Sequence, residues 1–310
     1  MSSMRLRSLI ERHVGVVFCL ALLLGIAFPA PEAGLNRFLL PLMGLLLFLS
    51  FLNVDLSHVA DELRNPLRPI FQIALNFLLV PAALFLILRL AGMPSFALAV
   101  LLLAAMPAGL GSAVFTSLAG GRVATSVVLS VLTHALTPLT VPFLFWIFAD
   151  VEIRVDLLGL ARQLALLIGI PMLAAAVARK VASPLVRATR PHHKLVSILA
   201  LACVAYIVIV PYAGTIRADA SSVVVPLLGT YVFYAALCLS AFLFARGRTP
   251  DEQAAIVISR TYMNNALAIV LATAFFDERV ALITILAEIP WFTTFGAYLW
   301  FQERWIKPKR

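Results

Sequence analysis

Residues 259–266 (SRTYMNNA) place polar side chains in the middle of a long apolar run. They supply a fixed positive charge, a hydroxyl group and two amide groups, from Arg260, Thr261, Asn264 and Asn265. Guanidinium, hydroxyl and amide groups together offer many hydrogen-bond donors and a few acceptors. An apolar segment that only packs against its neighbours does not require such polar groups, so these four residues are candidates for a solute-binding site.

A second apolar run is interrupted at residues 106–113 (MPAGLGSA). Pro107 removes a backbone donor, and Gly109 and Gly111 weaken a helix at this point. Two broken or polar segments, one in each half of the chain, are the best sequence indication of the central site of a secondary transporter. We therefore expect Gly109 and Gly111 to lie beside the substrate, together with the polar residues of the first segment.

A stripe of polar residues follows one face of the run at residues 123–149. Its members recur at helical spacing and are Ser126, Ser130, Thr133, His134 and Thr137. A single Ser or Thr in such a place more often bonds its own backbone or a neighbouring helix. The complete stripe, which faces the glycine-broken segment, instead predicts a lined cavity. His134 is either a hydrogen-bonding residue between helices or a proton carrier.

Two charges are expected deep in consecutive apolar runs. Arg260 lies in one and Glu288 in the next, and a charge at the bilayer centre costs at least about 2.5 kcal/mol. They could form a structural ion pair, or they could serve a substrate or a coupling ion. Arg162, near the start of another run, is expected to extend its charge to the membrane interface.

The composition indicates which elements must position these residues. Hydrophobic residues make up 62% of the 310-residue chain and charged residues 13%, about half the usual charged fraction of a soluble protein. The mean hydropathy is +1.01. Apolar runs long enough to cross a bilayer predict an all-α polytopic membrane protein with ten spans, at about 14–30, 36–54, 68–89, 94–118, 123–149, 156–178, 194–214, 221–245, 251–276 and 280–301.

The distribution of cations predicts the orientation of the spans. Most of the 24 lysines and arginines fall in segments on the same side of the membrane as the N-terminus. Because cytoplasmic segments are enriched in cations, this predicts that both termini are cytoplasmic. It also explains the basic charge without nucleic acid as a partner. The first run also has the shape of a signal peptide, but cleavage would leave nine spans and break this agreement. A basic loop at residues 179–194 would join two repeats, about 14–149 and 156–301. Because each repeat would have an odd number of spans, five, the second repeat would be inserted upside down relative to the first. This predicts a 5+5 inverted repeat.

The same residues resemble the bile acid:sodium symporter family over most of the chain. The likeness is carried by residues 76–81 (NFLLVP), 107–120 (PAGLGSAVFTSLAG), 124–130 (ATSVVLS) and 263–268 (MNNALA). The resemblance implies a core of spans 3–5 and 8–10, and a panel of spans 1, 2, 6 and 7. It also implies that spans 4 and 9 unwind and cross at the midplane.

The resemblance further implies two sodium sites at that crossing. The positions that correspond to their ligands and keep an oxygen-bearing side chain are Asn76, Ser112, Ser126, Ser130 and Ser259.

Three ligand positions have changed their chemistry. Ser259 stands where the family has a glutamate shared by both sites, Ala113 where it has an asparagine, and Met263 where it has a glutamine. Sodium is a hard cation that prefers oxygen ligands, so these changes predict weak sodium binding. Either Arg260 supplies the positive charge in its place, or Glu288 or His134 couples transport to protons.

We therefore expect a secondary-active transporter that carries a small organic anion by alternating access in the cell's inner membrane, with sodium coupling weakened or lost. No cofactor is expected beyond a coupling sodium ion or proton. An arsenite-type permease of the same fold is an alternative, although that resemblance suggests a cysteine at residues 106–108, which have none. An intramembrane enzyme or a membrane sensor is a further alternative, but no HExxH or GxSxG motif and no long polar loop is present.

Overall fold

The computed structural model describes residues 14–30, 34–53, 67–109, 111–148, 156–219, 221–302 and 304. The regular segments in these ranges are helices, which satisfy their own backbone hydrogen bonds in a bilayer. Six of the helices found there are long and apolar enough to cross a membrane, and four shorter helices are apolar as well. This is a multi-pass membrane protein.

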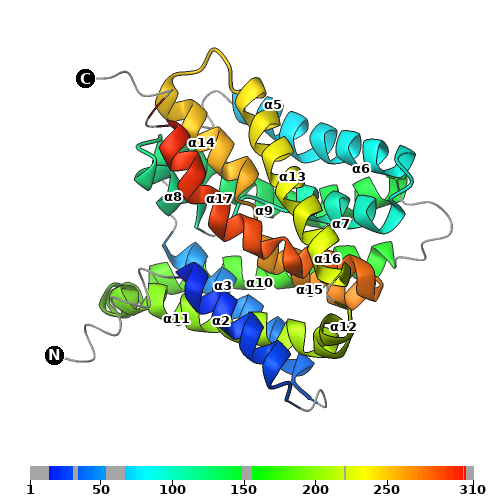
Figure 1. The fold of residues 1–310 in the computed structure, drawn as a ribbon. Helices are drawn as coiled ribbons and strands as arrows, with labels where there is room; N and C mark the ends of the chain where they lie inside the picture. Colours follow the sequence, from blue (N-terminus) through cyan, green and yellow to red (C-terminus); the bar gives the residue numbers. More distant parts are fainter. Residues whose placement is uncertain are drawn as a thin grey trace. The chain divides into compact units, whose positions relative to one another are not determined.

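The helices group into two compact units, and the first contains Met1–Val54 and Ala165–Val225. Its described elements are α2 (Val14–Ala27), η1 (Asn36–Phe38), α3 (Leu39–Leu52), the larger part of α10 (Leu157–Val181), α11 (Ser183–Ile209), η3 (Val210–Tyr212) and α12 (Ala213–Ala218). Within this unit α11 packs against both α2 and α3 (Figure 1). The hydroxyl of Tyr206 in α11 donates to the carbonyl of Phe28 and accepts from the amide of Ala30, which holds the chain just after α2.

The second unit contains Asp55–Leu164 and Pro226–Arg310. Its described elements are α5 (Leu67–Ala74), the π-helix η2 (Leu75–Leu79), α6 (Val80–Leu90), α7 (Pro94–Ala105), α8 (Ser112–Leu118), α9 (Val123–Phe148), most of α13 (Ser221–Phe244), α14 (Pro250–Thr261), α15 (Asn265–Phe275), α16 (Glu278–Leu286) and α17 (Glu288–Phe301). Ten of the twelve residues of α7 and eight of the eleven residues of α15 are buried, as expected for helices that are apolar on all sides. These two short helices therefore form the interior of the unit.

Two prolines disturb helices of the second unit next to polar residues. Pro81 cannot donate to the carbonyl of Phe77, and the helix takes a π turn at η2 just before it. Pro290 likewise cannot donate to the carbonyl of Leu286, and the helix is interrupted at Ala287, between α16 and α17. Each disturbance sets a polar side chain, Asn76 or Glu288, into the interior.

The predicted spans agree with the helices to within a few residues, with one exception. The basic segment at residues 179–194 is not a loop, because α10 continues to Val181 and α11 begins at Ser183. Pro191 lies inside α11. The prediction was wrong because charged residues were taken as a sign of a loop, whereas they extend the helix. Residues 1–13 and the predicted span ends at 54 and 149 lie outside the described residues.

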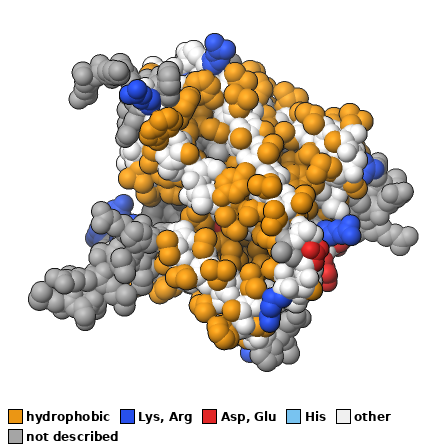
Figure 2. All heavy atoms as spheres, in the orientation of Figure 1, with side chains coloured by type: hydrophobic (Ala, Val, Ile, Leu, Met, Phe, Trp, Pro, Cys, Tyr) orange, Lys and Arg blue, Asp and Glu red, His pale blue; other side chains and the backbone are white. Residues whose placement is uncertain are grey.

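Large apolar side chains remain exposed over the outer faces of the helices. In the view of Figure 2 most visible side chains are hydrophobic, and charged side chains form only a few small groups. Leu90, Leu158 and Val181 are each more than 80% exposed. A water-soluble protein rarely exposes so much continuous apolar surface, so these faces fit contact with lipid.

The contact between α2 and α11 gives a test of the first unit. A Cβ atom at Gly25 would overlap the Ile209 side chain and lie 3.1 Å from the carbonyl oxygen of Tyr206, whereas a Cβ at Gly169 of α10 would meet nothing within 4 Å. Gly25→Ala should lower the free energy of unfolding by about 1–3 kcal/mol through overpacking. Gly169→Ala, a matched helical control, should not lower it. Thermal melting of the two purified variants measures the difference, and equal melting temperatures would contradict this packing.

Candidate functional site

The candidate site is built on two broken helices of the second unit that pair with each other. Helix α7 ends at Ala105 before α8 begins at Ser112, and α14 ends at Thr261 before α15 begins at Asn265. Ala108 and Met263, one from each break, form an antiparallel bridge. Irregular backbone is tolerated at membrane depth only beside protein or water, and here each break provides partners for the other.

Two backbone hydrogen bonds make this bridge. The amide of Gly109 donates to the carbonyl of Tyr262 at 2.8 Å, and the amide of Asn264 donates to the carbonyl of Pro107 at 2.8 Å. A Cβ atom at Gly109 would overlap the Tyr262 carbonyl oxygen. Gly109 is therefore needed for the close approach of the two chains, while Gly111 has no atom nearer than 3.8 Å to its would-be Cβ.

Side chains satisfy other backbone groups of the breaks. The amide of Ala108 donates to the hydroxyl of Thr133 at 3.1 Å, and the indole of Trp291 donates to the carbonyl of Met263 at 2.9 Å. The side chain of Asn264 accepts from the amide of Leu267 at 3.2 Å and so caps α15. The breaks are thus held in place by α9 and α17 as well as by each other.

Arg260, at the end of α14, is 1% exposed. Its Nη1 donates to the carbonyl of Ala104 at 2.6 Å, and the guanidinium lies 5.1 Å from the centre of the Phe77 ring. A cation at the last carbonyls of α7 interacts favourably with the helix dipole. Its Nε and Nη2 are buried without a hydrogen-bond partner, as is the hydroxyl of the neighbouring Thr261.

The candidate sodium-site residues are buried or half-buried, and two of them meet. The hydroxyls of Ser126 and Ser259 lie 3.0 Å apart, between α9 and α14. Asn76 donates from Nδ2 to the carbonyl of Gln72 at 3.0 Å and to its side-chain oxygen at 2.9 Å, and its own Oδ1 is buried without a partner. Ser112 is buried at the start of α8, and Ser130 is half-buried on α9.

The polar stripe of α9 faces the interior, and its members differ in what they contact. Thr137 donates to the carbonyl of Thr133, the ordinary bond of a threonine to its own helix. His134 is fully buried. Its Nδ1 lies 2.8 Å from the carbonyl of Ser130, and its Nε2 lies 3.3 Å from the side-chain nitrogen Nδ2 of Asn264. A carbonyl can only accept, so we assign the proton to Nδ1, and Nε2 accepts from Asn264.

Glu288 and Arg260 do not form the ion pair that the sequence left open. Both side chains are described, and no ion pair is present between them; Arg260 contacts α7 and η2 instead. Glu288, 3% exposed, lies beside Asn265 and Tyr234. Asn265 donates to the Tyr234 hydroxyl at 2.6 Å and to the Ala287 carbonyl at 3.5 Å. The two neighbouring asparagines thus face different partners.

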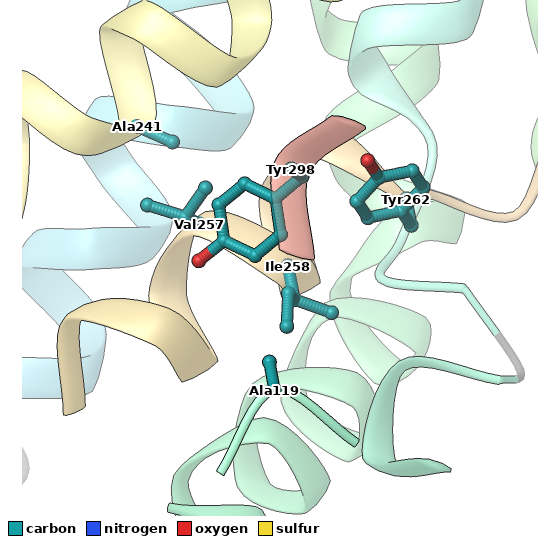
Figure 3. Packing of buried hydrophobic residues seen from close by; sticks show 6 residues of the cluster. All are labelled: Ala119, Ala241, Val257, Ile258, Tyr262 and Tyr298. Carbon is teal, nitrogen blue, oxygen red and sulfur yellow. The ribbon is translucent and has the colours of Figure 1, made fainter. Parts of the chain in front are cut away.

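Aromatic residues around the second break were missed by the sequence reasoning. Phe115 stacks on Phe295 with ring centres 4.3 Å apart, and Tyr262 packs edge-on against both Phe295 and Trp291. Figure 3 shows Tyr298 lying among Val257, Ile258 and Tyr262. Tyrosine and tryptophan near a polar break could have indicated these positions, but aromatic residues occur in several other apolar runs as well and give no specific signal.

The close approach at Gly109 gives a test of the paired breaks. Gly109→Ala should force the two breaks apart and lower the melting temperature, because the added methyl cannot fit against the Tyr262 carbonyl. Gly111→Ala, only two residues away, adds the same methyl to an open place and should leave the melting temperature nearly unchanged. A Gly109→Ala protein as stable as the Gly111→Ala protein would contradict the bridge.

Comparison with known proteins places these features in a family. The sequence profile of the Sodium Bile acid symporter family matches residues 40–222. The chain is 26% identical over 239 residues to the "Probable sodium/metabolite cotransporter BASS1, chloroplastic" of Arabidopsis thaliana, covering 75% of this chain and 59% of that protein. It is 26% identical over 127 residues to the "Uncharacterized sodium-dependent transporter YocS" of Bacillus subtilis (strain 168), covering 41% of this chain and 40% of that protein. The match over more than half of its length shows that the chain belongs to the sodium bile acid symporter family.

Proposed function

We propose that the protein carries a small organic anion across the cell's inner membrane by alternating access. The observation that carries this proposal is the pairing of two helix breaks in the interior of one compact unit. Paired breaks gather polar backbone and side chains at membrane depth, where a transported solute needs them. Family membership and the names of the two relatives, both transporters, support the same function.

The proposal includes an arrangement of the chain. We propose ten spans in a 5+5 inverted repeat with both termini cytoplasmic, in which the first unit is the panel and the second is the core. The membership of helices in the two units supports this division. The substrate would contact Arg260, Thr261, Asn264 and Asn265, with Gly111 leaving room for it, whereas the space beside Gly109 is taken by the Tyr262 carbonyl.

The charge of Arg260 favours an anion. Its guanidinium is buried, forms no ion pair within the described residues, and has two nitrogens without acceptors. An uncompensated buried charge is costly, and an arriving carboxylate would offset that cost while it accepts two N–H groups side by side. A neutral or cationic solute would leave the cost in place.

The residues at the candidate sodium sites support weakened coupling to sodium. Ser259 replaces the shared carboxylate expected from the family resemblance, and its hydroxyl bonds Ser126 instead. The amide of Asn76 is bound through its nitrogen to Gln72. What remains is hydroxyls and one amide oxygen without a negative charge, a poor set of ligands for a cation. The names of the two relatives mention sodium, so full coupling to sodium is the competing hypothesis.

Removing sodium tests the coupling. A panel of small mono- and dicarboxylates is first screened by thermal stabilisation of the purified protein in sodium-free buffer, and a stabilising compound is then followed into proteoliposomes. Replacing external sodium with potassium should change initial uptake by less than about twofold, because little coupling free energy links the ion and the substrate. Uptake that requires sodium would contradict the weakened coupling without contradicting transport.

Substituting Arg260 tests the anion site. Arg260→Met keeps much of the side-chain length but removes the charge, and it should lower uptake of the same carboxylate at least about tenfold, since hydrogen bonds to charged groups contribute about 1.5–3 kcal/mol. Arg162→Met removes an exposed arginine of α10 and should leave uptake unchanged. Melting curves of both variants show whether they fold. A folded Arg260→Met protein with normal uptake would contradict the proposed role.

A further inference from the structure

The cluster of Glu288, Asn265 and Tyr234 adjoins the anion site through Asn265 and adds a carboxyl group that the anion site does not use. Glu288 begins α17, Asn265 begins α15, and Tyr234 lies on α13. All three side chains are at most 3% exposed. One carboxyl oxygen of Glu288 and the amide oxygen of Asn265 are buried without a hydrogen-bond partner. Buried oxygens without a hydrogen-bond partner are costly and need an explanation, which a bound proton or ligand would supply.

No positive side chain balances Glu288. No ion pair to it is present within the described residues, and the titratable group that faces it is the uncharged Tyr234 of α13. From α15 it is faced by the neutral Asn265, and His134 of α9 contacts the next residue back, Asn264. A bare carboxylate in this place would carry a heavy desolvation cost, which a bound proton removes.

The donors around Glu288 favour a proton over a metal ion. The side-chain nitrogen of Asn265 donates to two acceptors, the Tyr234 hydroxyl and the Ala287 carbonyl, which fixes the orientation of the side chain. A sodium ion needs several oxygen ligands, whereas two oxygens of these three side chains are buried without a partner, one from Glu288 and one from Asn265. A protonated carboxyl group is neutral and needs no shell of ligands, so burying one of its oxygens without a partner costs less free energy.

The cluster is linked to the paired breaks through two short connections. Asn265 directly follows Asn264, whose amide forms one of the two bridge bonds. Trp291 lies three residues after Glu288, hence on the same side of α17, and donates to the Met263 carbonyl in the break. A change in the charge of Glu288 therefore acts on the elements that hold the break in shape.

We propose that Glu288, held by Asn265 and Tyr234, is a proton-binding site that couples carboxylate transport to proton movement. This rests on the proposed transport function. The carboxyl O–H bond forms with a proton from water on one side of the membrane, and it breaks when the proton passes to water on the other side. One proton and one monocarboxylate then cross together with no net charge. Binding of the proton removes a negative charge near the break, so each ligand favours binding of the other.

Infrared difference spectroscopy of the purified protein tests the site without transport, with protons and sodium ions as the only probes. The carbonyl band of a buried protonated carboxyl should be present at neutral pH in the wild-type protein and absent from Glu288→Gln. It should be unchanged in Glu278→Gln, which removes an exposed carboxyl from the preceding helix. Absence of the band from the wild-type protein, or its persistence in Glu288→Gln, would overturn the proposal. Loss of the band on adding sodium would also overturn it, in favour of a metal ion.

Transport measurements test the coupling. An inward proton gradient should accelerate wild-type uptake of the carboxylate in sodium-free proteoliposomes, and this acceleration should be lost in Glu288→Gln and kept in Glu278→Gln. Tyr234→Phe, which keeps the ring, should shift the pH dependence of uptake. A Glu288→Gln protein that still responds fully to the gradient would overturn the coupling. If no carboxylate is transported at all, the proposed function fails, and the infrared band still decides whether Glu288 binds a proton.

Discussion

The arrangement of the second unit depends on one interaction, the antiparallel bridge between Ala108 and Met263. A helix break in the interior of a membrane protein exposes amides and carbonyls that no water can satisfy. Here the amides of Gly109 and Asn264 and the carbonyls of Tyr262 and Pro107 satisfy one another across the two breaks. The two interruptions therefore stabilise each other, and neither could remain without the other.

Two buried ionisable side chains, Arg260 and Glu288, contact different half-helices. Arg260 ends the half-helix before one break and points toward α7 and η2, whereas the Glu288 cluster adjoins the half-helix that follows the break. A guanidinium at the C-terminal carbonyls of α7 supplies positive charge in a region where the family resemblance expects a bound cation. We interpret the arrangement as an anion site with a fixed charge and an adjoining proton site, both attached to the paired breaks.

The sequence predicted the helical class and both broken segments well, because apolar length, Pro107 and the polar residues of 259–266 act locally on the backbone. It could not predict which side chains meet. The similar depth of Arg260 and Glu288 was compatible with a salt bridge between them and with separate roles. The packing of α14 against other helices instead directs the guanidinium to the Ala104 carbonyl. Trp291 and Tyr234 carried no pattern in the sequence, yet they contact the break and Asn265. The continuous helix through residues 183–194 was missed because the basic residues there suggested a loop.

Amide hydrogen exchange, resolved to the residues of the two breaks, tests the bridge most directly. The amides of Gly109 and Asn264 lie outside any regular helix, so without pairing they would exchange as fast as those of an open loop. With the bridge intact, we expect both to be protected to the same degree as the amides of the buried helices α7 and α15. Rapid exchange of either amide in the purified, folded protein would show that the breaks do not pair and would contradict the proposed site.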